Sequence, residues 1–184
     1  ANQAVAVARL GGAVTFISKV GKDTFGRQSA QLFDEEGINT FHILSDEELP
    51  SGVALITVDE AGENSIVVAA GANGNLLRGD LQAAENEIAQ ADILLMQLEI
   101  PIDTVCYAAG VAARNDTKVI LNPAPMTALH PGLLSQVDII TPNRTEAEGL
   151  SGIRVKDLAT AKRAAERIYE MGVNNVVITM GSEG

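Results

Sequence analysis

The residues best placed to do chemistry in this sequence stand directly after predicted strands. The apolar run at residues 137–140 is typical of a buried strand, and it ends at Thr141-Pro142 because proline lacks an N–H donor and disfavours helix in the residue before it. A helical pattern then begins at Asn143, with Glu146 three residues later. Since open α/β sheets bind ligands at the carboxyl ends of their strands, this stretch predicts a binding site at a sheet edge.

Asn143 and Glu146 allow two interpretations. An Asn at the N-cap and a Glu at the third helical position form a capping box, in which each side chain satisfies a backbone N–H of the other residue. In the second interpretation the helix N-terminus faces an anionic oxygen, and Glu146 holds Mg²⁺ through water. One Glu suffices for that role, because magnesium keeps most of its waters. Spacing alone favours the cap, and the two roles are compatible.

Two further strand ends carry candidates of the same kind. Glu99 follows a strand predicted at residues 93–96, and its carboxylate is either solvated or able to accept hydrogen bonds from sugar hydroxyls. The Gly-Ser-Glu-Gly run at residues 181–184 is either an ordinary loop or a turn whose N–H groups cradle a phosphate. The sequence has no Walker A motif and no Gly-x-Gly-x-x-Gly turn after a strand, so dinucleotide binding has no support.

Strands and helices alternate along most of the chain. Helices are predicted at residues 1–9, 23–36, 80–90, 101–115, 143–150 and 157–171, and strands at 13–20, 38–44, 93–96, 119–121, 137–140 and 176–180. Such alternation produces right-handed βαβ units, in which the carboxyl ends of the strands share one edge. We therefore expect an α/β fold with a Rossmann-like, mostly parallel sheet and helices on both faces.

The helix predicted at residues 157–171 has the clearest pattern. Leu158, Ala161, Ala165 and Ile168 recur at helical spacing, and the charged residues lie between them. These four residues are the expected core-facing stripe of the helix.

One segment interrupts the alternation. Residues 53–58 are apolar and β-branched, a polar turn with one glycine follows at 59–64, and residues 66–68 resume the strand. This pattern predicts a β-hairpin. We expect segment 52–70 to be a small β lid or an interface added to the core, the alternative being two ordinary strands of the main sheet.

Composition and charge exclude several classes of protein. The 184 residues are 46% hydrophobic, and no apolar run approaches the roughly 18 residues of a membrane span. A formal net charge of -11 argues against nucleic-acid binding, which needs a basic face. Residues 1–92 carry 14 acidic and 5 basic side chains against 10 and 8 in the rest, so the second half suits an anionic ligand better. The lone Cys106 and the lack of a secretory pattern predict a cytoplasmic protein.

The ordered motifs of the chain resemble those of the ribokinase family of sugar kinases, over nearly the whole length. The opening Ala-Asn-Gln-Ala-Val-Ala is similar to the end of that family's first signature. The motifs that follow in the family's order are Gly52-Val53-Ala54-Leu55-Ile56, Gly71-Ala72-Asn73, Met96-Gln97-Leu98-Glu99, Asn122-Pro123-Ala124-Pro125 and Thr141-Pro142-Asn143-Arg144-Thr145-Glu146. A single tripeptide is a weak signal, but this many in order are specific.

The resemblance implies a role for each candidate residue. Asn2 and Glu99 would contact the sugar, and Asn143 would contact the nucleotide. Glu146 would belong to the Asn-x-x-Glu motif that organises Mg²⁺ and phosphate. The nucleotide site would also include Thr179, Gly181, Ser182 and Gly184. The hairpin at 52–70 would be part of a lid over the sugar and would contribute to a homodimer.

The resemblance also implies that residues 1–184 are a partial domain, with family elements missing at both ends. No residue of this chain is assigned a catalytic role, because the general base Asp and the anion hole would lie beyond Gly184, as would a monovalent-cation (K⁺) site. The parent protein would transfer phosphate from ATP, with Mg²⁺, to the 5-hydroxyl of D-ribose. The 184 residues alone are expected to be inactive, because phosphoryl transfer depends on positioning and charge stabilisation.

Two alternatives stay open at this point. A related family kinase would act on fructose, 2-keto-3-deoxygluconate or a nucleoside, since most of the sugar contacts lie outside the chain. A non-catalytic sugar-binding or interaction module would retain the scaffold without the chemistry.

Overall fold

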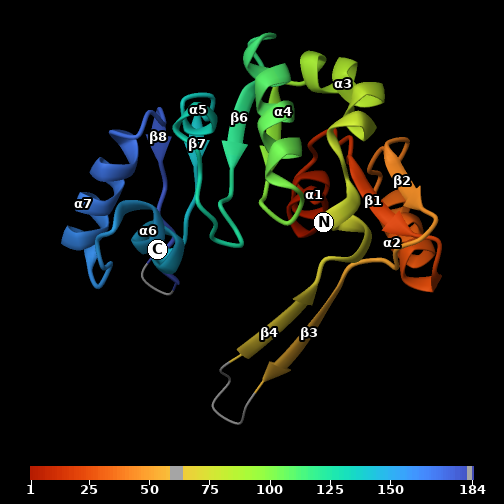
Figure 1. Ribbon diagram of the computed structural model, residues 1–184, viewed down its shortest axis with the longest axis horizontal. Coiled ribbons are helices and arrows are strands. Elements are labelled where there is room, and N and C mark those ends of the chain that lie inside the picture. Colours follow the sequence, from red (N-terminus) through yellow and green to blue (C-terminus); the bar gives the residue numbers. More distant parts are fainter. Residues whose placement is uncertain (59–63, 182–183) are drawn as a thin grey trace. The chain divides into compact units, whose positions relative to one another are not determined.

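The computed structural model describes residues 1–58, 64–181 and 184, and its contacts group the chain into two compact units (Figure 1). The first unit contains residues 1–84 and the second contains residues 85–184. That the two units belong to one partial domain stays a prediction.

The first unit is built around a short parallel strand pair. It contains helices α1 (Asn2–Arg9) and α2 (Thr24–Glu35) and strands β1 (Ser18–Gly21) and β2 (Ile43–Asp46). The pairing of β1 with β2 runs in parallel from Ser18 opposite Ile43 to Gly21 opposite Asp46. Helix α2 begins where Asp23 Oδ1 accepts a hydrogen bond from the Gly26 N–H at 2.8 Å.

Both strands of this pair are shorter than the sequence predicted. Pairing begins near the predicted start, where Thr15 bridges Asn39 and the Phe16 N–H donates to the Asn39 carbonyl at 3.0 Å. A turn closed by the Ile43 N–H and the Thr40 carbonyl then interrupts the ladder. Regular pairing is therefore confined to residues 18–21 and 43–46, and it extends one and two residues beyond the predicted ends at 20 and 44.

The hairpin is a separate two-stranded sheet, as the sequence predicted. Strands β3 (Val53–Val58) and β4 (Asn64–Ala69) are antiparallel, with Val53 opposite Ala69 and Val58 opposite Asn64 (Figure 1). Residues 59–63, which hold most of the predicted turn, lie outside the described residues. The alternative that these are two ordinary strands of the main sheet is wrong.

Two 3₁₀ helices follow the hairpin, η1 (Gly71–Asn75) and η2 (Arg78–Ala84). The helix predicted at 80–90 is thus divided between η2 and an α-helix, α3 (Glu85–Gln90). Asp80 Oδ2 accepts a hydrogen bond from the Leu77 N–H at 2.8 Å, which fixes the start of η2 at Arg78.

The second unit contains the predicted parallel sheet. Its strands β5 (Ile93–Met96), β6 (Lys118–Leu121), β7 (Ile139–Ile140) and β8 (Asn175–Val176) lie in that order, and each neighbouring pair is parallel. Its further helices are α4 (Ile102–Ala113), α5 (Pro131–Leu134), α6 (Arg144–Ser151) and α7 (Leu158–Tyr169). Helix α4 packs on β5 and β6, and α7 packs on β8 (Figure 1). The α/β class and the parallel sheet are confirmed, whereas the single turn of α5 had no counterpart in the prediction.

The core of the second unit lies between the central strands and α4. Val119, Leu121 and Ile140 are fully buried, as are Val105 and Ala109 on α4. Small and β-branched side chains on α4 allow close contact with β5 and β6. Within the described part of the chain, no helix has the length and apolar character needed to cross a membrane.

The last strand is shorter than the predicted 176–180. The Val177 N–H donates to the Ile140 carbonyl and the Thr179 N–H to the Pro142 carbonyl, both at 2.9 Å. Pro142 has no N–H to return a bond, so the ladder is one-sided beyond Val176. It ends as an isolated bridge between Asn143 and Thr179.

The core-facing stripe of α7 is partly as predicted. Ala161 and Ile168 are buried and Ala165 is half-buried, but Leu158 is 80% exposed, so its assignment to the stripe was wrong. Helical side chains tilt toward the N-terminus, and the first residue of a helix therefore points beyond the region that is packed. Ala164, absent from the predicted stripe, is fully buried.

Ile168 and Leu158 provide a matched test of this packing. Ile168→Ala is expected to lower the free energy of unfolding of the full-length protein by about 2–5 kcal/mol, because it leaves a cavity. Leu158→Ala is expected to change it by less than about 0.5 kcal/mol. Urea denaturation of both variants measures the difference, and equal losses would contradict the packing described here.

Candidate functional site

The N-terminus of α6 has the geometry of a capping box, as the sequence predicted. Asn143 Oδ1 accepts a hydrogen bond from the Glu146 N–H at 2.9 Å, and Glu146 Oε2 accepts one from the Asn143 N–H at 2.8 Å. Asn143 is exposed, whereas Glu146 is only 7% exposed. The cap therefore uses one carboxylate oxygen of Glu146 and leaves the Asn143 side chain at the surface.

Thr179, in the segment after β8, lies directly beside Asn143, in the segment after β7. An isolated parallel bridge joins the two residues. Gly181 follows two residues later with a φ of +66°, and Gly184 has a φ of +123°. Both values lie in the left-handed region that favours glycine. The Gly184 N–H donates to the Gly181 carbonyl at 3.2 Å. Ser182, assigned to the same site, lies outside the described residues.

Glu99 lies at the same edge of the same sheet. The Leu98 N–H donates to the Ala124 carbonyl at 2.8 Å, and the Asn122 N–H donates to the Met96 carbonyl at 2.9 Å. Glu99 thus follows β5 at the point where β5 and β6 stop pairing, and it is exposed. One strand, β6, separates β5 from β7, so the ends of β5 and β7 are about 10 Å apart across the sheet.

Asn2 belongs to the first unit, where it is the first residue of α1 and is exposed. The second unit therefore places five of the predicted site residues at the carboxyl edge of its sheet. They are Glu99, Asn143, Glu146, Thr179 and Gly181. This arrangement offers a carboxylate for hydroxyl groups on one side and a helix N-terminus with a glycine turn for anionic oxygens on the other.

At the opposite end of β7, Asp138 fixes the strand that leads to this site, a role that the sequence did not reveal. Asp138 Oδ2 accepts a hydrogen bond from the Val119 N–H at 2.9 Å, and Oδ1 lies 3.3 Å from Lys118 Nζ. Burial raises the pKa of Asp138, but the Val119 N–H and Lys118 lower it more, so the net pKa is below its ordinary value of 3.8. An Asp immediately before an apolar run was the only signal in the sequence.

Asp138 should make stability depend on pH in the acidic range. Asp138→Ala is expected to lower the free energy of unfolding by about 1–3 kcal/mol at pH 7, because the Val119 N–H loses its partner. A lowered pKa in the folded state means that the ionic part of this stabilisation is complete above the ordinary pKa and is lost as the pH falls below it. Denaturation from pH 7 to pH 2.5 should show the difference from wild type shrinking below about pH 4. Glu166→Gln on the exposed face of α7 is the control, and a pH-independent difference would contradict this role for Asp138.

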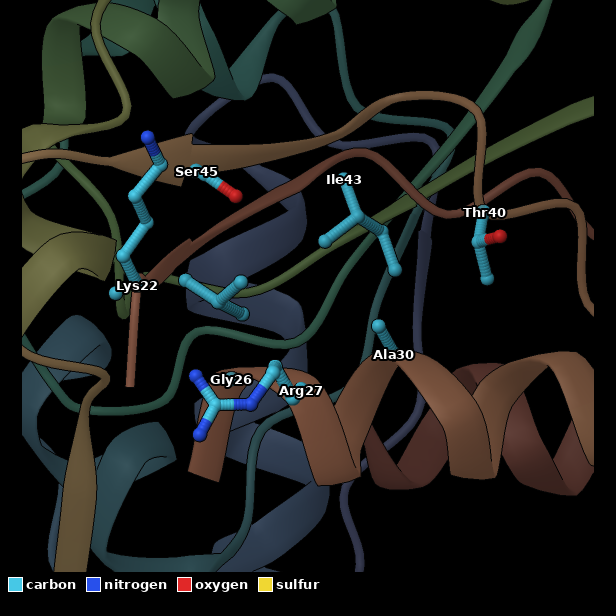
Figure 2. A pocket seen from close by; sticks show the side chains of 9 residues that line it. Lys22, Gly26, Arg27, Ala30, Thr40, Ile43 and Ser45 are labelled. Atoms are coloured by element: carbon cyan, nitrogen blue, oxygen red, sulfur yellow. The ribbon is translucent and has the colours of Figure 1, made fainter. Parts of the chain in front are cut away.

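A cavity of about 340 Å³ lies elsewhere, in the first unit between α2 and the β1–β2 pair. Figure 2 shows Lys22 and Arg27 at one end of it and Thr40 at the other. Lys22 is paired with Glu47, and Arg27 Nη2 donates to Thr24 Oγ1 at 3.1 Å. None of the predicted site residues lines this cavity, and both of its cations already contact side chains of the protein.

The fold is that of an α/β protein, and its candidate site lies where the parallel strands end. The family described as pfkB family carbohydrate kinase matches residues 1–184, and the chain belongs to that family. The resemblance stated from the motifs is thereby confirmed.

Individual relatives are similar over the whole chain. It is 48% identical over 184 residues to a ribokinase of Haemophilus influenzae and 40% identical over 184 residues to a ribokinase of Staphylococcus aureus, in each case covering 100% of this chain and 60% of the relative. The solved structure of Arabidopsis thaliana ribokinase complexed with ribose and ATP has a TM-score of 0.92 at 28% identity, covering 100% of this chain and 60% of that one. The chain thus spans about 60% of the length of these relatives.

Proposed function

We propose that the protein to which this chain belongs is an ATP-dependent kinase that phosphorylates the 5-hydroxyl of D-ribose. The observation that supports it best is the sheet edge that carries Glu99 on one side and the α6 N-terminus on the other. Identity of 48% to a ribokinase favours ribose over the other sugars of the family. A phosphoryl acceptor and a phosphoryl donor have to lie side by side, and this edge offers one subsite for each.

Glu99 is proposed to bind the sugar. Its exposed carboxylate is acceptor-only, so it suits a ligand that presents two or more hydroxyl donors. Charge-assisted bonds of this kind contribute roughly 1.5–3 kcal/mol each. Asn2, exposed at the start of α1, is proposed to complete the sugar contacts with its amide.

Asn143 and the turn after β8 are proposed to bind the nucleotide. The positive end of the α6 dipole favours a phosphate near Asn143. Thr179, beside Asn143, extends this surface with a hydroxyl, and the turn from Gly181 through Ser182 to Gly184 is proposed to follow the phosphates with its N–H groups.

Glu146 is proposed to hold Mg²⁺ through water. Its Oε2 already accepts the Asn143 N–H, and among the described residues no group of three or more His, Cys, Asp and Glu side chains could hold a metal ion. A single carboxylate suits an ion that keeps most of its waters and takes its other ligands from phosphate. When bound, Mg²⁺ offsets negative charge on the transferred phosphoryl group.

The hairpin β3–β4 is proposed to be part of a lid over the sugar and of a homodimer interface. Leu55 and Val67, 68% and 64% exposed, share one face, and Ile56 and Val68, 60% and 62% exposed, share the other. A two-stranded hairpin with two exposed apolar faces is marginal in water. One face over the sugar and the other against a second copy would bury both, and lid closure would exclude water as a competing acceptor.

The chain by itself is proposed to lack catalysis, since no residue of it is assigned as general base. That base, the anion hole and a K⁺ site are proposed to lie in the remainder of the protein. A cytoplasmic location is proposed as well, in line with the single, half-buried Cys106.

The substrate assignment predicts a definite order of activities. Full-length protein should phosphorylate ribose with a higher kcat/KM than 2-deoxyribose, fructose or adenosine, because a site that bonds hydroxyls rejects analogues that lack or misplace them. The 184-residue chain should show no ribose-dependent ATP turnover, and the full-length protein should sediment as a dimer. Coupled ADP-release assays and analytical ultracentrifugation measure these outcomes. A preference for fructose or adenosine would refute the ribose assignment, and turnover by the 184-residue chain would refute the missing base.

Glu146→Gln separates the cap from the metal role. Glutamine preserves the capping box, so the free energy of unfolding should change by less than about 0.5 kcal/mol. The Mg²⁺ concentration for half-maximal activity should rise about 10–100-fold, the usual effect of losing a residue that orients metal-bound groups. Glu166→Gln removes the same charge on α7 and serves as the control. If the Mg²⁺ concentration for half-maximal activity is unchanged, Glu146 has only the capping role and the metal role is wrong.

A further inference from the structure

The two ends of the hairpin converge on a small segment of the first unit, the hairpin root (residues 46–52 and 70–75). Here the Ala72 N–H donates to the Pro50 carbonyl at 2.8 Å. A Cβ added to Gly71 would lie 2.3 Å from the Pro50 oxygen, and one added to Gly52 would lie 2.6 Å from the Ala70 oxygen. Only glycine allows the two chains to approach this closely.

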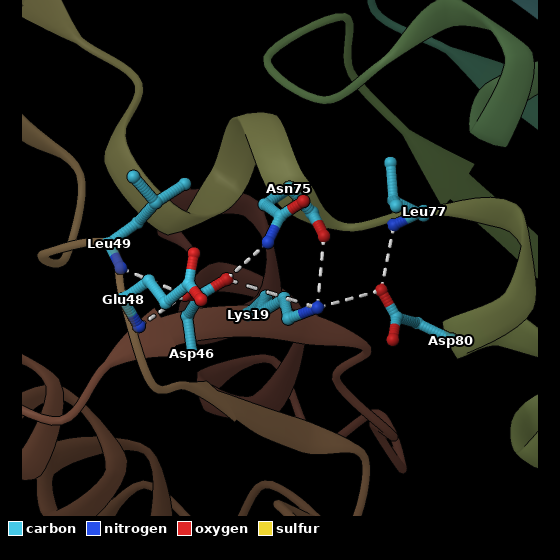
Figure 3. Close-up of polar contacts among 7 residues, drawn as sticks. All are labelled: Lys19, Asp46, Glu48, Leu49, Asn75, Leu77 and Asp80. Carbon is cyan, nitrogen blue, oxygen red and sulfur yellow. Dashed lines mark hydrogen bonds and ion pairs between the residues drawn. The ribbon is translucent and has the colours of Figure 1, made fainter.

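A single carboxylate joins both sides of the root (Figure 3). Asp46 Oδ1 accepts hydrogen bonds from the Glu48 N–H at 3.0 Å and the Leu49 N–H at 2.9 Å, on the side that leads into β3. Asp46 Oδ2 accepts a hydrogen bond from Asn75 Nδ2 at 2.5 Å, on the side that leaves β4. The side chain of Asp46 is only 4% exposed.

Lys19 connects this carboxylate to β1. Its Nζ donates to the Asn75 carbonyl and to Asp80 Oδ2, both at 3.0 Å, and lies 4.0 Å from Asp46 Oδ2 (Figure 3). The Lys19 side chain is 13% exposed, so its charge is largely removed from water and compensated by two carboxylates. Lys19, Asp46, Asn75 and Asp80 together form what we term the root clamp.

Asp46 is the ionised centre of the root clamp. The hydrogen bond from Asn75, followed by those from the Leu49 and Glu48 N–H groups, lowers the pKa of Asp46 to about 2. Asp46 is therefore ionised at any pH near neutrality.

Asp23 provides a second anchor. Its Oδ2 accepts a hydrogen bond from the Ser51 N–H at 2.7 Å and its Oδ1 accepts one from Ser51 Oγ at 2.8 Å, while the Gly21 N–H donates to Ser51 Oγ at 3.0 Å. Because Asp23 also caps α2, the root is fixed to α2 and to β1 at once.

The strands beyond the root have no comparable anchor among the described side chains, since β3 and residues 67–69 of β4 are exposed on both faces. Six residues of strand extend about 20 Å, so a tilt of about 10° at the root moves the far end by about 3 Å. The orientation of the whole hairpin is thus decided at its root.

We propose that Lys19 and Asp46 are positioning residues that hold the hairpin in the orientation in which it covers the bound sugar. The proposal rests on the sugar kinase function proposed above. A loosened root would let the apolar face withdraw from the sugar and would admit water, which competes with the sugar hydroxyl for the phosphoryl group.

The test compares Asp46→Ala and Asp46→Asn with Glu47→Gln in the full-length protein. Glu47 is the matched control, because it is adjacent in sequence, loses the same charge and belongs to an exposed ion pair with Lys22. Asp46→Ala should raise the KM for ribose about tenfold with a change in kcat below about threefold, the pattern of lost ground-state binding. The ratio of ADP formed to sugar phosphate formed should rise above one.

Asp46→Asn should show the same changes to a smaller degree, and it carries the test if Asp46→Ala does not fold. Combining Asp46→Asn with Asn75→Asp exchanges the carboxylate and the amide and keeps a charge for Lys19. This double variant should return the KM for ribose to within about threefold of wild type. A merely structural role would lower kcat and stability without changing the ADP ratio.

Hydrogen exchange makes the outcome independent of activity. Amides of β3 and β4 should exchange faster in Asp46→Ala than in wild type or Glu47→Gln. If wild type phosphorylates ribose and Asp46→Ala matches Glu47→Gln in KM, ADP ratio and exchange, the positioning role is wrong and the kinase function stands. If wild type phosphorylates no sugar, the kinase function fails and the positioning role fails with it, whatever exchange shows about the anchor.

Discussion

Pro142 has no N–H group, and this determines where the β7–β8 pairing ends and α6 begins in the second unit. Pro142 accepts a hydrogen bond from Thr179 but returns none, so the pairing of β7 and β8 becomes one-sided and ends at the bridge between Asn143 and Thr179. The chain is then free to turn at Asn143 and begin α6 with a complete capping box. Because α6 starts where the ladder stops, its positive end lies at the carboxyl edge of the sheet, beside the glycine turn and across β6 from Glu99. Every candidate contact in this unit depends on that edge.

The two units hold their functional elements by different means. In the second unit, α4 packs its apolar side chains against β5 and β6, and the site residues follow the strands as short extensions. In the first unit, the hairpin has no core of its own and is held at its root by buried polar groups. Buried polar groups can fix the orientation of the hairpin, which apolar packing does not, because their hydrogen bonds have defined partners and angles.

The chain belongs to the pfkB family and spans about 60% of the length of its relatives, and the candidate site lies at the carboxyl edge of its sheet. The sugar and phosphate subsites proposed here consist of single residues or short turns on separate strands. Catalysis by such a site depends on how precisely the strands and the hairpin are held, and less on any one side chain. For this reason the proposed function would depend on residues that position these elements, such as Asp138 at the start of β7 and Asp46 at the hairpin root.

The sequence by itself determined what short-range chemistry controls. The capping box of Asn143 and Glu146, the strand at residues 53–58 and the order of strands and helices all follow from residues a few positions apart. Only the tertiary structure revealed the root clamp and the exposure of Leu158. In the clamp, the hydrogen-bonding partners Lys19 and Asp80 are 61 positions apart in the sequence. Contacts between such distant residues depend on how elements pack, and packing is a property of the folded chain that no local pattern contains.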